Sequence, residues 1–184
     1  MWVGRLVEEG GAWLKAKLAA EESLDKIAPQ VISAFVPSAA DKEWLSLYAI
    51  ADEAEAELLA AALRYNQGNI VACHFATADT SHLEALGIAI RKTAGTTYHP
   101  WANDRHYEIH IPDLGGLTRA LQAFAAGPYF RVEQPTVLTC LQTSAVEGKI
   151  DIDALVEPTK INGQVATRTM ELVKTSHLQL SPAT

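Results

Sequence analysis

The feature that most constrains the fold is the strict alternation of apolar and polar side chains over residues 105–111. The apolar members are Tyr107, Ile109 and Ile111, and the polar members between them are His106, Glu108 and His110. Successive side chains of a strand point to opposite faces of a sheet, so this period of two predicts a half-buried strand. Residues 96–99 are β-prone and residues 100–104 have turn chemistry, which together predict a hairpin over 96–111.

Strand and helix patterns alternate on both sides of this hairpin. Residues 69–76 and 129–133 have strand character, and so do residues 136–142 after Pro135. Helices are predicted from a capping pattern at Ser81 and from an Asp113 cap, although residues 88–92 alone could form a strand instead. The order β-α-β-β-α-β predicts a ferredoxin-like α+β core over residues 69–143. In that fold, residues 69–75 and 105–111 would be neighbouring strands.

The segments that flank this core have different patterns. Apolar residues at helical spacing predict two helical pieces over residues 2–36 and a long helix over residues 39–66, so residues 1–68 are interpreted as a helical N-terminal region packed on the core. Residues 144–184 are interpreted as a C-terminal extension of β or mixed structure, in which residues 165–173 could equally form a helix.

The composition restricts the classes of function. The 184-residue chain has a net charge of -7 and no cluster of basic residues, so we expect no nucleic-acid partner. No run of apolar residues is long enough to span a membrane, and no leader pattern opens the chain. Its two cysteines, Cys73 and Cys140, lie in apolar runs and indicate a reducing compartment. A soluble cytoplasmic protein is the expectation.

Histidines and tryptophans supply the candidate site residues. With the predicted strand pairing, three histidines and one glutamate would lie together on one open sheet face, with His99 close by on the hairpin. These four residues are His74, His106, Glu108 and His110. Imidazole and carboxylate groups could hold a divalent metal ion or perform acid-base chemistry, but an open sheet face is polar in any case. We therefore expect no metal and no cofactor. Aromatic side chains that could anchor an interface are Trp2, Trp13 and Trp101.

These observations favour a non-enzymatic protein-interaction or assembly module as the first hypothesis. Nucleophile and zinc-protease motifs are absent from the sequence, and segments at both ends of the core are available for protein contacts. The module would be a subunit of a homo-oligomer or a regulator that binds a partner protein. Two alternatives stay open: a small histidine-dependent enzyme, with or without a metal, and a small-ligand-binding module of the same fold.

Overall fold

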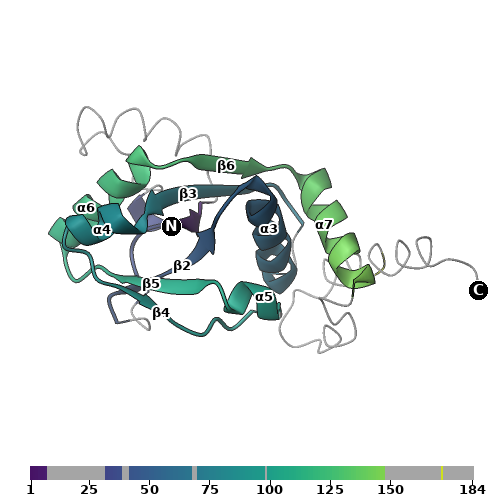
Figure 1. Ribbon diagram of the computed structural model, residues 1–184, viewed down its shortest axis with the longest axis horizontal. Coiled ribbons are helices and arrows are strands. Elements are labelled where there is room, and N and C mark those ends of the chain that lie inside the picture. The colour runs from purple at the N-terminus through teal and green to yellow at the C-terminus, as the bar shows by residue number, and fades with distance from the viewer. Residues whose placement is uncertain (8–31, 39–41, 68–69, 98, 148–170, 172–184) are drawn as a thin grey trace, which may run out of the picture.

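The protein has an α+β fold built on one antiparallel sheet (Figure 1). The computed structural model describes residues 1–7, 32–38, 42–67, 70–97, 99–147 and 171. The described residues form six strands and five helices. In chain order these are β1 (Trp2–Leu6), β2 (Trp44–Ile50), α3 (Glu53–Gln67), β3 (Cys73–Asp79), α4 (Thr80–Ala85), β4 (Ile90–Lys92), α5 (Pro100–Asn103), β5 (His106–His110), α6 (Leu114–Ala126), β6 (Tyr129–Val132) and α7 (Gln134–Val146).

The strands lie in the order β4-β5-β2-β1-β3-β6, and every neighbouring pair is antiparallel. The predicted pairing of residues 69–75 with residues 105–111 is therefore wrong. Both segments contribute strands, β3 and β5, but β1 and β2 lie between them. The strand order of a ferredoxin-like core over residues 69–143 is not obtained, because two central strands come from the region that was predicted to be helical.

The predicted long helix over residues 39–66 is in fact strand β2 followed by helix α3. The boundary is set by side chains at the helix start. Asp52 Oδ1 accepts a hydrogen bond from the Glu55 backbone N–H at 2.9 Å, and Glu55 Oε2 accepts one from the Ala51 N–H at 2.8 Å. This exchange resembles a capping box and satisfies donors that the first turn leaves free. Residues 39–41 lie outside the described residues.

The N-terminal segment is also different from the prediction. Residues 2–6 form β1, a central strand that pairs with β2 on one side and β3 on the other. A strand in the middle of a sheet has apolar side chains on both faces, so its pattern is easily taken for a helical stripe. The rest of the predicted helical pieces, over residues 8–31, lies outside the described residues.

Two further segments were predicted as strands and are not strands. Residues 96, 97 and 99 are not in a strand, and His99 is the N-cap of the short helix α5; residue 98 lies outside the described residues. Residues 136–142 belong to α7, and Pro135 lies in the first turn of that helix, where a missing backbone N–H costs nothing. The strand alternative for residues 88–92 is confirmed in part, because Ile90–Lys92 forms β4. The Asp113 cap is confirmed: Asp113 Oδ1 accepts from the Gly116 N–H at 2.7 Å.

Helices cover both faces of the sheet and produce two hydrophobic clusters. We call the faces the α4/α6 face and the α3/α7 face; Figure 1 places these helix pairs on the left and on the right. The first cluster joins the α4 and α6 side chains to strand residues that include Leu45, Leu47, Ala76 and Ile109. The second joins α3 and α7 to strand residues that include Ile50, Cys73, Phe75 and Val132. Apart from residues 144–147 and 171, the predicted C-terminal extension lies outside the described residues.

Candidate functional site

The sheet divides the predicted histidine set between its two faces. Phe75 of β3 packs in the cluster beneath α3 and α7, whereas Ile109 of β5 packs beneath α4 and α6. The apolar sides of these two strands thus point in opposite directions. In consequence, His74 lies on the α4/α6 face, and the three polar residues of β5 lie on the α3/α7 face. The predicted single face with all four side chains is not formed.

His74 of β3 contacts Tyr129 of β6, and these two strands lie at one edge of the sheet. Its Nδ1 atom is hydrogen-bonded to the Tyr129 hydroxyl at 2.5 Å, and the two rings are stacked with centroids 5.9 Å apart. Burial lowers the pKa of His74, and the nearby positive charge of Arg131 lowers that pKa further. The hydrogen bond and ring contact between His74 and Tyr129 join β3 to β6.

His99 and Trp101 lie in the short helix segment beside β5. His99 is buried, and its ring meets the Trp101 ring edge-on at a centroid distance of 6.1 Å. The other neighbour of Trp101 is Arg105, whose guanidinium carbon lies 4.3 Å from the indole centroid. Trp101 is partly buried against the α3/α7 cluster, so its contacts are within its own fold. Trp13 lies outside the described residues.

His106 is also withdrawn from solvent. Only 7% of the residue is exposed, its Nδ1 lies 2.7 Å from the Thr93 hydroxyl, and its ring meets Tyr48 at 5.2 Å. Burial lowers the pKa of His106, and the negative charge of Glu108 opposes that shift without cancelling it.

The lowered pKa of His106 gives a testable dependence of stability on pH. Between its unfolded-state pKa of about 6.5 and its lower folded-state pKa, the unfolded chain binds more protons, so acidification favours unfolding. We expect the free energy of unfolding, measured by urea titration, to fall as the pH decreases from about 7 through 6.5 towards 5. The His106→Gln variant should lose part of this slope. An unchanged slope in the variant would assign the pH dependence to other groups, such as His74.

The remaining members of the predicted face form a compact cluster around Trp44. The Arg91 guanidinium carbon lies 3.7 Å from the Trp44 ring centroid, and the His110 ring centroid lies 4.9 Å from that of Trp44. Arg91 donates to Glu108 Oε2 from Nε at 2.7 Å, and His110 Nε2 lies 3.1 Å from Glu43 Oε2. We refer to Glu43, Trp44, Arg91, Glu108 and His110 as the Trp44 surface.

The Trp44 surface is ordered but open to solvent. The side chains of Glu43, Arg91 and His110 are 57%, 49% and 35% exposed. Glu43 has a φ of 70°, in the left-handed region that is uncommon for a residue with a side chain. Its carbonyl accepts a hydrogen bond from the Ile111 N–H at 2.7 Å, which holds this turn against the end of β5. The sequence reasoning missed Trp44 because its spacing from Leu47 and Tyr48 fits a helical stripe.

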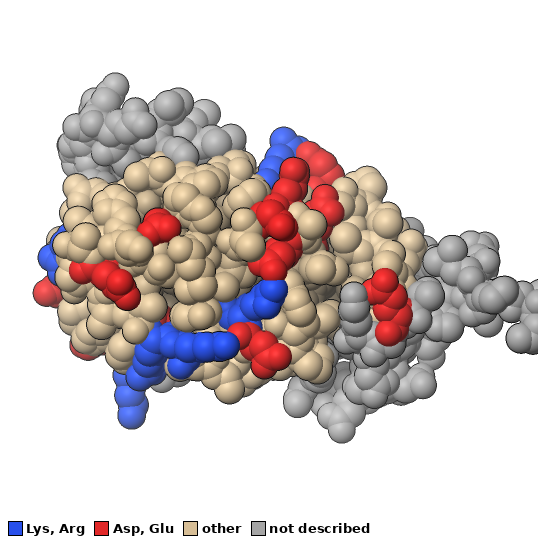
Figure 2. Space-filling model, viewed as in Figure 1, with Lys and Arg blue, Asp and Glu red and all other residues tan. Residues whose placement is uncertain are grey.

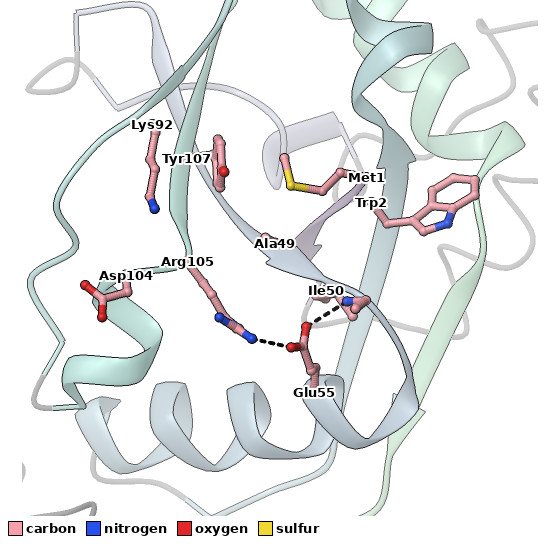
Figure 3. A pocket seen from close by; sticks show the side chains of 10 residues that line it. Met1, Trp2, Ala49, Ile50, Glu55, Lys92, Asp104, Arg105 and Tyr107 are labelled. Carbon is pink, nitrogen blue, oxygen red and sulfur yellow. Dashed lines mark hydrogen bonds and ion pairs between the residues drawn. The ribbon is translucent and has the colours of Figure 1, made fainter.

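A pocket of about 520 Å³ lies on another part of the sheet, where β1, β2 and β5 meet the start of α3 (Figure 3). Arg105 forms an ion pair with Glu55 in its wall, and the Ala49 N–H donates to the Arg105 carbonyl at 2.8 Å. Trp2, one of the predicted interface residues, also lines the pocket. Nothing in the sequence pattern indicated this site, because its residues come from five separate segments.

Several broader features bear on the predicted classes of function. Among the described residues, no three His, Cys, Asp or Glu side chains lie close enough together to hold a metal ion. In the same part of the chain, none of the helices has the length and apolar character needed to cross a membrane. Figure 2 shows acidic and basic side chains interspersed on the face in view, without a broad basic patch. The absence of a nucleic-acid partner stays a prediction.

No protein-family model, no curated protein and no solved structure matches this sequence or its fold. The proposed function therefore depends on the chain's own residues.

Proposed function

We propose that the protein is a non-enzymatic assembly module that associates with a second copy of itself through the Trp44 surface. The observation that carries the proposal is the contact of the half-buried Trp44 indole with both an arginine and a histidine, each of them partly exposed on the sheet. Trp and Arg are the residue types that contribute most to binding at protein interfaces. These ring contacts, the Arg91–Glu108 ion pair and the His110–Glu43 hydrogen bond hold the side chains in place, which reduces the entropy lost on binding.

The charges of this surface support a second copy as the partner. A two-fold interface uses the same patch on both subunits, so the patch must be complementary to itself. The Trp44 surface contains the cation of Arg91 and the carboxylates of Glu43 and Glu108 around one aromatic centre. A two-fold axis near Trp44 brings the exposed Glu43 of one copy towards Arg91 of the other. Ion pairs of this kind set the orientation, while burial of the two indole rings supplies most of the affinity.

Trp44→Ala should weaken self-association by about tenfold or more, because an interface hot spot contributes on the order of 2 kcal/mol. Sedimentation velocity over a range of protein concentrations measures the dissociation constant. Leu114→Ala is the control: it removes a side chain that is 76% exposed from α6, a helix that packs on the opposite face of the sheet from Trp44, and should leave the dissociation constant unchanged.

A second variant covers the possibility that loss of the indole disturbs the sheet. Glu43 is exposed, so Glu43→Arg should leave the far-UV circular dichroism unchanged while placing like charges together across the two-fold axis. We expect it to weaken association, with a smaller effect at high salt. A wild-type chain that sediments as a monomer at every concentration would overturn the proposal. Equal weakening by Leu114→Ala would do so as well.

We also propose a reducing, cytoplasmic location for the protein, and its cysteines support that proposal. Cys73 and Cys140 are both free thiols, and Cys73 is fully buried beside the Arg64 guanidinium, whose Nε lies 3.0 Å from the sulfur. Burial raises the pKa of both thiols, which keeps them in the protonated, less reactive form.

A further inference from the structure

We infer that the pocket beside Arg105 binds a small anion that carries an apolar body, such as an alkyl or aryl carboxylate, sulfonate or phosphate monoester. This site is separate from the Trp44 surface. Lys92, which lines the pocket, and Arg91, which belongs to the Trp44 surface, are consecutive residues of a strand and point to opposite faces of the sheet. The inference therefore does not depend on self-association.

Lys92 supplies a positive charge that forms no ion pair with the part of the chain that the structure describes. The residue is exposed. Figure 3 shows the Lys92 side chain beside the Tyr107 ring, while the Arg105 guanidinium is turned towards Glu55. The Tyr107 hydroxyl adds a donor that requires no charge.

Arg105 and Glu55 place an ion pair in the wall of the pocket. The Arg105 Nη2 atom pairs with Glu55 Oε1, and the indole of Trp101 supports the guanidinium plane. The other oxygen of Glu55 is occupied by the Ala51 N–H. These contacts with Glu55 and Trp101 fix the Arg105 guanidinium in one wall of the pocket.

The remaining wall is apolar. Ala49, Ile50 and Trp2 line the side away from Lys92, as Figure 3 shows. The pocket volume of about 520 Å³ is within the range of typical small-molecule sites, roughly 300–1,000 Å³. A ligand with a charged end and an apolar body matches this division, because the body displaces water from the apolar wall and the charged end remains beside the cations.

Asp104 makes the sign of the ligand charge testable. This exposed carboxylate also lines the pocket, and Figure 3 shows it turned away from the Arg105 guanidinium. It repels a bound anion and would attract a bound cation. Removing its charge must therefore strengthen the binding of an anion and weaken the binding of a cation.

The test uses the fluorescent anion 1-anilinonaphthalene-8-sulfonate and its neutral analogue N-phenyl-1-naphthylamine, which has the same aromatic body without the sulfonate. We expect one sulfonate probe per chain and weaker binding of the neutral analogue. Lys92→Gln should weaken binding of the sulfonate about tenfold, and Asp104→Asn should strengthen it about twofold to fivefold. Arg131→Gln, which removes another exposed cation, paired with Glu133 at the opposite edge of the sheet, should leave it unchanged.

Competition identifies the chemistry of the charged end. Octanoate and octyl phosphate should both displace the sulfonate probe, and the stronger competitor distinguishes a carboxylate from a phosphate ester; octylamine should not compete. The inference is overturned if the probe does not bind stoichiometrically, or if Lys92→Gln and Arg131→Gln have the same effect. Weaker binding in Asp104→Asn, or displacement by octylamine, would overturn it in favour of a cationic ligand.

Discussion

Replacing Phe124 by alanine is expected to lower the free energy of unfolding by about 3–5 kcal/mol, the usual cost of removing a buried aromatic ring. Phe124 is fully buried on the inner side of α6, and its ring centroid lies 4.9 Å from that of Phe35. Because Phe35 belongs to a separate segment, the deletion leaves a cavity between two elements that cannot easily close. Leu121, 3% exposed on the same helix, should show a loss of about 2–5 kcal/mol.

Urea titration with circular dichroism measures both losses. Leu114→Ala is the control in the same helix, since its side chain is 76% exposed and should contribute less than about 0.5 kcal/mol. A loss below about 1 kcal/mol for Phe124→Ala would mean that α6 presents a different side to the sheet.

Gly127→Ala is expected to destabilise the protein at or above the upper end of the roughly 1–3 kcal/mol that overpacking usually costs. An added Cβ at this position would lie 1.8 Å from the carbonyl oxygen of Thr77, which is a backbone atom of β3 and cannot rotate away. The φ of Gly127 is -81°, so the penalty is steric and does not come from the backbone conformation. The clash occurs where the Thr77 N–H and hydroxyl both donate to the Pro128 carbonyl, at 3.2 and 2.6 Å, and hold β6 to β3.

Gly115→Ala is the matched control for this substitution. An added Cβ there meets its nearest neighbour, the N-cap oxygen Oδ1 of Asp113, at 3.2 Å, far less close than at Gly127, and alanine is favoured over glycine in a helix by up to about 1 kcal/mol. Thermal unfolding of the two variants should therefore move in different directions, or at least differ by several degrees. Similar midpoints for both would mean that α6 and β6 can separate from β3 without cost.

The sequence predicted those elements whose signals are local. The helix from Leu114 has an N-cap at Asp113 and one apolar stripe, and it was found where expected. Strand β5 alternates strictly, since Ile109 packs beneath α4 and α6 while the other side of the strand carries polar side chains. Strand β2 was missed because Leu45 and Leu47 are buried on one face and Ile50 on the other. Apolar residues on both sides of a strand produce the spacing of a helical stripe.

The candidate sites were less predictable, because sites depend on strand order. One error about which strands are neighbours was enough to place His74 on the wrong side of the sheet relative to His110. The Trp44 surface combines residues from a turn and three strands, and the pocket combines Trp2 with Glu55 and Arg105. No spacing along a single sequence encodes such distant combinations; only the fold brings them together.

The central position of β1 has a consequence for how the chain folds. Its partners are β2 and β3, and the β3 residue opposite Trp2 is Asp79. Both partners are far from β1 along the chain, so each pairing closes a long loop. Closing a long loop costs chain entropy before the pairing restores any free energy, which slows folding. Until β3 has joined, one side of β1 presents unpaired N–H and C=O groups, and these can capture a strand of another chain. The period before residues 73–79 are in place is therefore the stage at which aggregation competes most strongly with folding.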